Sequence, residues 1–269
     1  MFKRFVERND RLVHRFLEII PGVFSWSLIL FPVWGSFWIP HYVAYYIILF
    51  IVFWFYKSFI MAFSAVLSHL KLNAAMKYDW IGDAKKFKDF KNIHHLIVIP
   101  TYKEPIHTLE RGIDSIKKQD FPSKQISVCV AFEDREGRDA RDKAALIAKK
   151  YKGVFGDIIF TFHPDIAYEV KGKSSNEAYA GKFCKKLLVD KQKMNINNII
   201  VTSKDADGVF SEKYLSAVAY GFLANPKKYL LFWQPIILFY TNIWKVPAPI
   251  RVMNSLGSVW QTAQNSRTD

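Results

Sequence analysis

The sequence predicts an α/β domain with a mostly parallel sheet and helices on both faces, preceded by a two-helix transmembrane hairpin. Two observations predict this fold class. Two long apolar runs lie within the first 70 residues, and from residue 95 onward short apolar runs alternate with helical periodicities. Strands that alternate with helices are typical of a parallel sheet, and ligands of such sheets bind at the carboxyl ends of the strands.

The composition agrees with a chain that joins very apolar and very charged segments. Of the 269 residues, 51% are hydrophobic and 23% are charged, and the formal net charge is +14. These values exclude the disordered, collagen-like and disulfide-scaffold classes. Cys129 and Cys184 lie far apart, without partners at zinc-finger spacing, so we interpret both as small core residues.

Residues 1–70 are predicted to hold a basic arm and two membrane spans, at about residues 19–40 and 42–67. The first run carries no charged residue, and the second carries Lys57 alone. Each is long enough to cross a hydrocarbon core of about 30 Å, with a tight connection at Pro40-His41. A cleaved signal peptide is the alternative, but a second apolar run follows the first at once.

Basic residues flank both outer ends of this hairpin, whereas its connection carries neither Lys nor Arg. They are Lys3, Arg4, Arg8, Arg11 and Arg15 before the first run, and Lys71, Lys77, Lys85, Lys86, Lys88 and Lys91 after the second. Positive charge collects on the cytoplasmic side of membrane proteins, so we expect both ends of the hairpin and the following domain there. Membrane lipid is the expected partner of much of this charge, and no nucleic-acid partner is expected.

Residues 71–94 are predicted to form an amphipathic juxtamembrane linker, because apolar and lysine residues alternate there at helical spacing. Two alternatives remain open for it. The linker lies on the membrane surface, or it packs on the domain that follows.

Residues 95–269 form the predicted α/β domain. Apolar positions that recur at intervals of three and four residues predict helices between its strands. The strands are expected at residues 96–99, 126–132, 158–162, 199–202 and 230–233.

Polar residues follow the first two predicted strands. Residues 100–105 combine an aromatic ring, a hydroxyl group and a carboxylate, a combination that suits a nucleoside, although a helix start without a ligand is the alternative. Glu133 and Asp134 follow the second strand, and their carboxylates can accept hydrogen bonds from a base. A solvated turn is the alternative there.

Two further segments suggest a phosphate and a metal site. Residues 171–176 place lysines, a glycine and hydroxyl groups before a predicted helix, and a helix N-terminus favours a diphosphate. They do not match the P-loop pattern. Asp205 and Asp207 directly follow the fourth strand, and two such carboxylates can hold a hard divalent cation that bridges substrate phosphates.

Taken in order, residues 98–105, 132–134, 171–176 and 205–207 resemble the family 2 glycosyltransferases with the GT-A fold, over about residues 95–240. Membrane-anchored relatives such as cellulose synthase and polyprenyl-phosphate sugar transferases are similar in carrying flanking transmembrane helices. The resemblance implies a Rossmann-like GT-A domain and a metal-dependent, inverting transferase of the hexosyltransferase type. Its donor would be a UDP- or GDP-linked sugar and its acceptor a glycan or lipid, as in the synthesis of cell envelope polysaccharide.

The resemblance also implies roles for individual residues. Asp205 and Asp207 would bind Mn²⁺ or Mg²⁺, with Asp207 the more direct ligand. Glu133-Asp134 departs from the commoner Asp-Asp pair of the family. The implied nucleotide-sugar-binding residues are Pro100, Thr101, Tyr102, Glu104, Asp134, Lys173, Asn176 and Asp205.

The catalytic base is not identified. Between Glu212 and Asp269 the sequence holds no Asp or Glu, whereas inverting relatives carry their base in a later acidic motif, and processive ones add Gln-x-x-Arg-Trp. We favour a C-terminally incomplete chain, because residues 255–264 look like a segment that continues. The alternatives are a non-catalytic membrane-anchored scaffold that binds nucleotide sugars and a haloacid-dehalogenase-like phosphatase, with Asp205 as its nucleophile.

Overall fold

The computed structural model describes residues 10–240 and 243–264. Lys3, Arg4 and Arg8 of the predicted basic arm, and the last five residues, lie outside the described residues. The chain divides into two compact units, Met1–Ser68 with Thr262–Asp269, and His69–Gln261.

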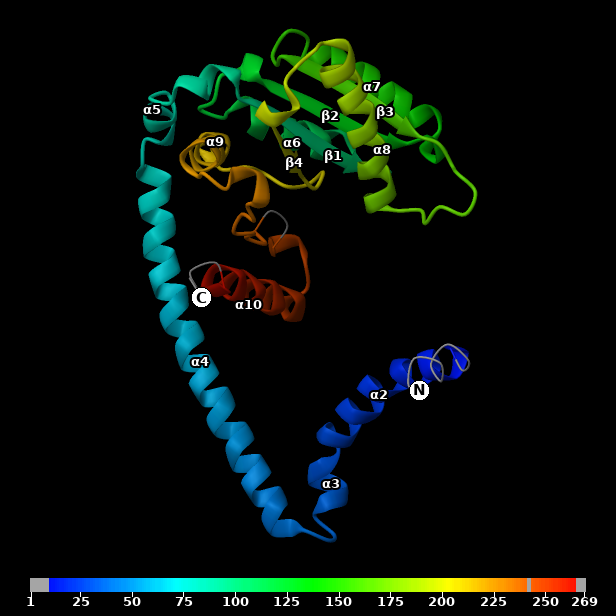
Figure 1. Cartoon of the computed structure of the whole chain (residues 1–269), viewed down its shortest axis with the longest axis vertical. Helices are drawn as coiled ribbons and strands as arrows, with labels where there is room; N and C mark the ends of the chain where they lie inside the picture. Colours follow the sequence, from blue (N-terminus) through cyan, green and yellow to red (C-terminus); the bar gives the residue numbers. More distant parts are fainter. Residues whose placement is uncertain (1–9, 241–242, 265–269) are drawn as a thin grey trace. The chain divides into compact units, whose positions relative to one another are not determined.

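The first unit contains the two candidate membrane spans (Figure 1). Helix α2 spans Asp10–Ile29, the short helix α3 spans Phe31–Gly35, and helix α4 spans Pro40–Lys77 and continues into the second unit. Helices α2 and α4 are long and apolar enough to cross a membrane, and most of their apolar side chains are exposed. Exposed apolar helices of this length favour an association with lipid.

The connection of the hairpin lies four residues before the predicted one. The turn occupies residues 36–39, and Pro40 is the first residue of α4, so the predicted turn at Pro40-His41 is wrong. Proline is well suited to the first helical position because its missing N–H needs no partner there. The Tyr46 hydroxyl donates to the Leu28 carbonyl at 3.1 Å and so ties α4 to α2.

The second unit is built on a parallel sheet of four strands in the order β3-β2-β1-β4. These strands were predicted within two residues at each end. Since all four run in the same direction, their carboxyl ends meet at one edge of the sheet. Their bounds are β1 His94–Thr101, β2 Ile126–Glu133, β3 Asp157–His163 and β4 Ile199–Ser203.

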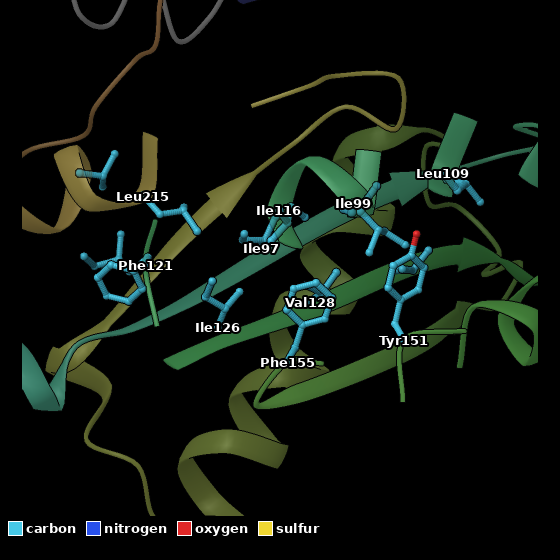
Figure 2. Close-up of a cluster of buried hydrophobic side chains, with 14 of the residues drawn as sticks. Ile97, Ile99, Leu109, Ile116, Phe121, Ile126, Val128, Tyr151, Phe155 and Leu215 are labelled. Atoms are coloured by element: carbon cyan, nitrogen blue, oxygen red, sulfur yellow. The ribbon is translucent and has the colours of Figure 1, made fainter. Parts of the chain in front are cut away.

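Helices cover both faces of this sheet, as predicted. Because strand side chains alternate between faces, Ile97 and Ile99 join one apolar core (Figure 2), whereas Leu96 and Val98 join another. Helices α6 (Ile106–Lys117), α7 (Arg138–Lys150) and α9 (Tyr214–Ala224) pack on the first core, and α8 (Lys173–Lys185) packs on the second.

The fifth predicted strand is wrong. The short 3-10 helix η6 covers Lys228–Leu230, and residues 231–233 form neither strand nor helix. Trp233 packs instead on Phe222 of α9, with ring centroids 6.2 Å apart. Strand β4 therefore lies at an edge of the sheet, and Val201 within it is 61% exposed.

The predicted linker at residues 71–94 is divided: residues 71–77 continue helix α4, and α5 and η1 pack on the α/β domain, which is the second of the two alternatives. Helix α5 (Trp80–Ala84) lies against α9, where the rings of Trp80 and Tyr220 are 5.4 Å apart. The 3-10 helix η1 (Lys88–Asn92) buries Phe90 against Phe121. Near the other end of the described chain are the 3-10 helix η7 (Ile243–Lys245) and helix α10 (Ala248–Gln264).

Candidate functional site at the carboxyl edge of the sheet

The D-x-D turn begins where β4 ends. The Lys204 amide donates to the Val98 carbonyl at 2.9 Å, and the Gly208 amide donates to the Asp205 carbonyl at 3.0 Å, which closes the turn. Within the turn, Asp205 and Asp207 are exposed, whereas Lys204 and Ala206 between and beside them are buried. The alternation places both carboxylates at the surface of the domain.

Buried Lys204 supports this turn from beneath. Its side chain lies against α6, where a Cβ atom added to Gly112 would come within 2.7 Å of the Lys204 Nζ. Burial lowers the pKa of Lys204 to about 8, and the nearby charges of Asp207 and Asp205 oppose this lowering. The ammonium group thus partly offsets the repulsion between the two carboxylates.

Lys173 and Asp205 are brought together, although they are 32 residues apart in the sequence. Lys173 is the first residue of α8, and its ammonium group donates to the Asp205 carboxylate. This hydrogen bond is the main cause of the raised pKa of Lys173. The residue expected to face a diphosphate and a residue expected to hold a metal are therefore direct neighbours.

Glu177 also belongs to this group, and sequence reasoning missed it. Its carboxylate lies 3.6 Å from the Lys173 Nζ and accepts a hydrogen bond from Ser203 Oγ at 2.6 Å. The signal in the sequence was its position one helical turn after Lys173, on the same face of α8. It was missed because its tie to the end of β4 is not local.

Asn176 occupies the first turn of α8 but is only 1% exposed. Its Nδ2 donates to the Ala131 carbonyl of β2 at 2.8 Å, so the side chain fastens α8 to the sheet. Its buried Oδ1 has no hydrogen-bond partner within the part of the chain that the structure describes. A buried acceptor such as this oxygen is normally paired with a hydrogen-bond donor.

The end of β1 carries the residues expected to bind a nucleoside. Pro100 lies within β1, and Thr101 ends it with a buried Oγ1 that also lacks a partner among the described residues. Tyr102 is exposed, and Glu104 is partly buried in the loop before α6. These side chains therefore lie at the same edge of the sheet as the D-x-D turn.

The face of the Tyr102 ring is covered by a cation that was not predicted. The Arg135 guanidinium group lies 4.1 Å from the ring centroid and is held there by the buried Glu133 carboxylate, which raises the pKa of Arg135. A planar guanidinium group stacks well on an aromatic ring. The surface expected to stack on a base is therefore a Tyr102–Arg135 pair.

Asp134, the residue expected to bind the base, has a partner as well. Its Oδ1 accepts a hydrogen bond of 2.6 Å from Arg141 of α7. Both side chains remain about half exposed, so the pair is screened by water and open to exchange.

Two larger cavities flank the D-x-D turn, and neither is lined by Asp205 or Asp207. The cavity at the ends of β2 and β3, lined by Glu133, Arg135 and His163 among others, has a volume of about 10 Å³, room for about one water molecule. A cavity of about 450 Å³ lies beside α6, and one of about 360 Å³ runs along β4. Lys173, Asp205 and Asp207 are themselves exposed, so the candidate site is an open surface.

The carboxylates at this edge suit a hard cation only when a substrate completes the site. No group of three His, Cys, Asp or Glu side chains in the described ranges is arranged to hold a metal ion. Asp205 and Asp207 supply oxygen ligands, and Mg²⁺ or Mn²⁺ commonly takes one or two carboxylates with phosphate oxygens and water. The residues present therefore fit a metal that arrives with a phosphate.

A comparison of the chain with models of known protein families found no match, and a comparison with curated proteins found no significant match. Any function assigned to the chain therefore rests on its own residues.

Proposed function

We propose that the chain is a membrane-bound glycosyltransferase of the GT-A type that uses a UDP- or GDP-linked sugar. The observation that carries the proposal is the contact between Lys173 and Asp205 at the carboxyl edge of a parallel sheet. It joins an expected phosphate-binding lysine to an expected metal-binding carboxylate. Ligands of parallel α/β sheets bind at this edge.

In this proposal, different residues bind the base, the nucleoside, the diphosphate and the metal of the donor. Tyr102 with Arg135 faces the base, and the hydroxyl group of Thr101 and the carboxylates of Glu104 and Asp134 offer hydrogen-bond partners to the nucleoside. Lys173 and the N-terminus of α8 face the diphosphate. Asp205 and Asp207 would hold Mn²⁺ or Mg²⁺, which supplies positive charge to the departing nucleoside diphosphate.

The acceptor half of the reaction needs a further group. Transfer with inversion requires a carboxylate that takes the proton from the acceptor hydroxyl while that oxygen attacks the anomeric carbon. The acceptor is a glycan or a lipid, and the candidate spans α2 and α4 favour work at the membrane. We assign the catalytic domain to the cytoplasmic side because of the basic flanks of the hairpin.

A second candidate function is a membrane-anchored protein that binds nucleotide sugars without transferring them. The observation that favours it is the absence of Asp and Glu between Glu212 and Asp269. The phosphatase alternative has less support, since its nucleophilic aspartate normally follows the first strand of the domain and Asp205 follows β4.

The test is calorimetric binding of UDP and of GDP to the detergent-solubilised chain, with and without Mn²⁺. We expect metal-dependent binding in the unchanged chain and at least about a tenfold loss in Asp207→Ala, the scale of a lost charged ligand. Asp142→Ala, at an exposed carboxylate of α7, is the control and should bind normally.

If both variants and the unchanged chain bind UDP or GDP with equal affinity, the assignment of Asp207 as a metal ligand is wrong. Transfer of a labelled sugar to membrane lipid or glycan then separates an enzyme from a scaffold. Turnover of a phosphomonoester without any binding of UDP or GDP would support the phosphatase.

A further inference from the structure

The Lys173 ammonium group lies where positive charge is expected from a metal. It bonds to Asp205 of the D-x-D turn and lies 3.6 Å from the Glu177 carboxylate. A lysine ammonium group and a divalent cation compete for the same carboxylate oxygens. While Lys173 is bound to Asp205, the D-x-D pair has one of its two carboxylates already neutralised.

This contact can be exchanged. The side chains of Lys173 and Asp205 are 51% and 66% exposed, so water screens their attraction. Lysine also carries its charge on a long flexible stem that can turn toward another anion. Lys173 is therefore free to leave Asp205 without disturbing the packing of α8.

A second observation concerns the same first turn of α8, where Asn176 keeps a buried Oδ1 with no hydrogen-bond partner in the described part of the chain. An amide oxygen only accepts hydrogen bonds, so a hydroxyl group of the donor, and not its phosphate oxygens, would suit this atom. The N-terminus of this 13-residue helix also favours an anion. A diphosphate at this turn would give Lys173 a new partner as Asp205 loses it.

We propose that Lys173 is exchanged between Asp205 and the diphosphate of the donor, so that metal and diphosphate bind together and the metal alone binds weakly. The inference rests on the proposed function and adds an order of binding to it. Before the donor arrives, Lys173 covers Asp205. With the donor and its metal bound, Asp205 would be a ligand of the metal and the Lys173 ammonium group would bind a phosphate oxygen.

The experiment measures the binding of Mn²⁺ alone, and of UDP or GDP with Mn²⁺, to the detergent-solubilised full chain. Lys173→Met removes the competing charge and keeps the length of the side chain. We expect it to raise the affinity for Mn²⁺ alone by about tenfold, the scale of one charge-assisted hydrogen bond. The same variant should bind the nucleoside diphosphate with Mn²⁺ more weakly, because its phosphate contact is lost.

Lys185→Met is the matched control. Lys185 is the last residue of α8, carries the same charge, and pairs with Asp190 at 3.6 Å instead of with the D-x-D turn. It should change the affinity for Mn²⁺ alone by less than about twofold, since exposed charges at a distance are screened. Opposite effects on the two ligands in Lys173→Met, with neither in Lys185→Met, would support the exchange.

Two results overturn the proposal in distinguishable ways. If UDP and GDP bind the unchanged chain with Mn²⁺ but Lys173→Met and Lys185→Met have equal affinity for Mn²⁺ alone, the exchange fails and the proposed function stands. If neither nucleotide binds the unchanged chain with Mn²⁺, both fail. Circular dichroism of each variant checks that the fold is retained.

Discussion

At the scale of single residues, burial has changed the chemistry of several polar side chains. His95 of β1 is fully buried and packs edge-on against Phe121, with ring centroids 4.7 Å apart. Burial lowers the pKa of His95 from 6.5 to about 3, because the charged imidazolium ion loses its water. The imidazole is therefore neutral at physiological pH and serves packing.

The buried His95 predicts a pH dependence of stability. Between pH 3 and 6.5 the unfolded chain binds one more proton at this residue than the folded chain does. The contribution of neutral His95 to the free energy of unfolding is thus complete above pH 6.5. It is lost as the pH falls below that value, by at most about 1.4 kcal/mol for each pH unit. Denaturant unfolding from pH 7 to 4 should show a smaller loss in His95→Leu than in the unchanged chain.

The exposed His107 of α6 provides the control for this prediction. His107→Leu removes a histidine from an exposed position of the same domain, so it controls for the substitution itself. Equal pH dependence in His95→Leu and the unchanged chain would contradict the assignment of a neutral, buried His95.

At the scale of elements, the D-x-D turn depends on its close approach to α6. A Cβ atom at Gly112 would lie 2.7 Å from the Lys204 Nζ and 2.9 Å from the Ala206 carbonyl oxygen. The backbone of the turn must move to admit it. The glycine therefore lets the turn between the two aspartates pack directly on the helix.

Gly112→Ala is expected to lower the free energy of unfolding by about 1–3 kcal/mol, the usual cost of overpacking. It should also weaken the binding of Mn²⁺ with UDP or GDP, because the two carboxylates are displaced. Gly181→Ala in α8 is the control, since its Cβ would meet nothing within 4 Å. Alanine there should leave nucleotide binding unchanged and stabilise α8 by up to about 1 kcal/mol.

At the scale of the whole molecule, two candidate spans precede an α/β domain that packs around its own two cores. The basic residues on both outer flanks of the hairpin predict one orientation, with the connection at residues 36–39 on the outer side. The native cysteines Cys129 and Cys184 are fully buried, which allows single added cysteines to report on this orientation.

A thiol reagent that does not cross membranes tests the orientation in intact cells. Cysteine at Ser36, in the connection, should react from outside. Cysteine at Ser123, at the start of the partly exposed η2 turn (Ser123–Gln125), should react only after the membrane is opened. The unchanged chain should stay unlabelled in both conditions. Labelling of Ser123→Cys from outside would reverse the proposed orientation.

The sequence was sufficient where the information is local. Apolar runs and helical spacings predicted four strands and the helices between them, since side-chain burial repeats every two residues in a strand and about every 3.6 in a helix. The same rule failed at residues 230–233, where Trp233 packs on α9 but Leu230, Leu231 and Phe232 are exposed. The apolar composition of a short run does not determine whether the fold buries it.

The sequence by itself determined which polar segments follow the strands, and so which residues stand at the carboxyl edge of the sheet. Only the tertiary structure decided their partners. It joined Lys173 to Asp205, brought Glu177 beside them and stacked Arg135 on Tyr102. The physical reason is that these contacts join segments separated along the chain, and their distances follow from how α8 and the strands pack, which no local pattern records.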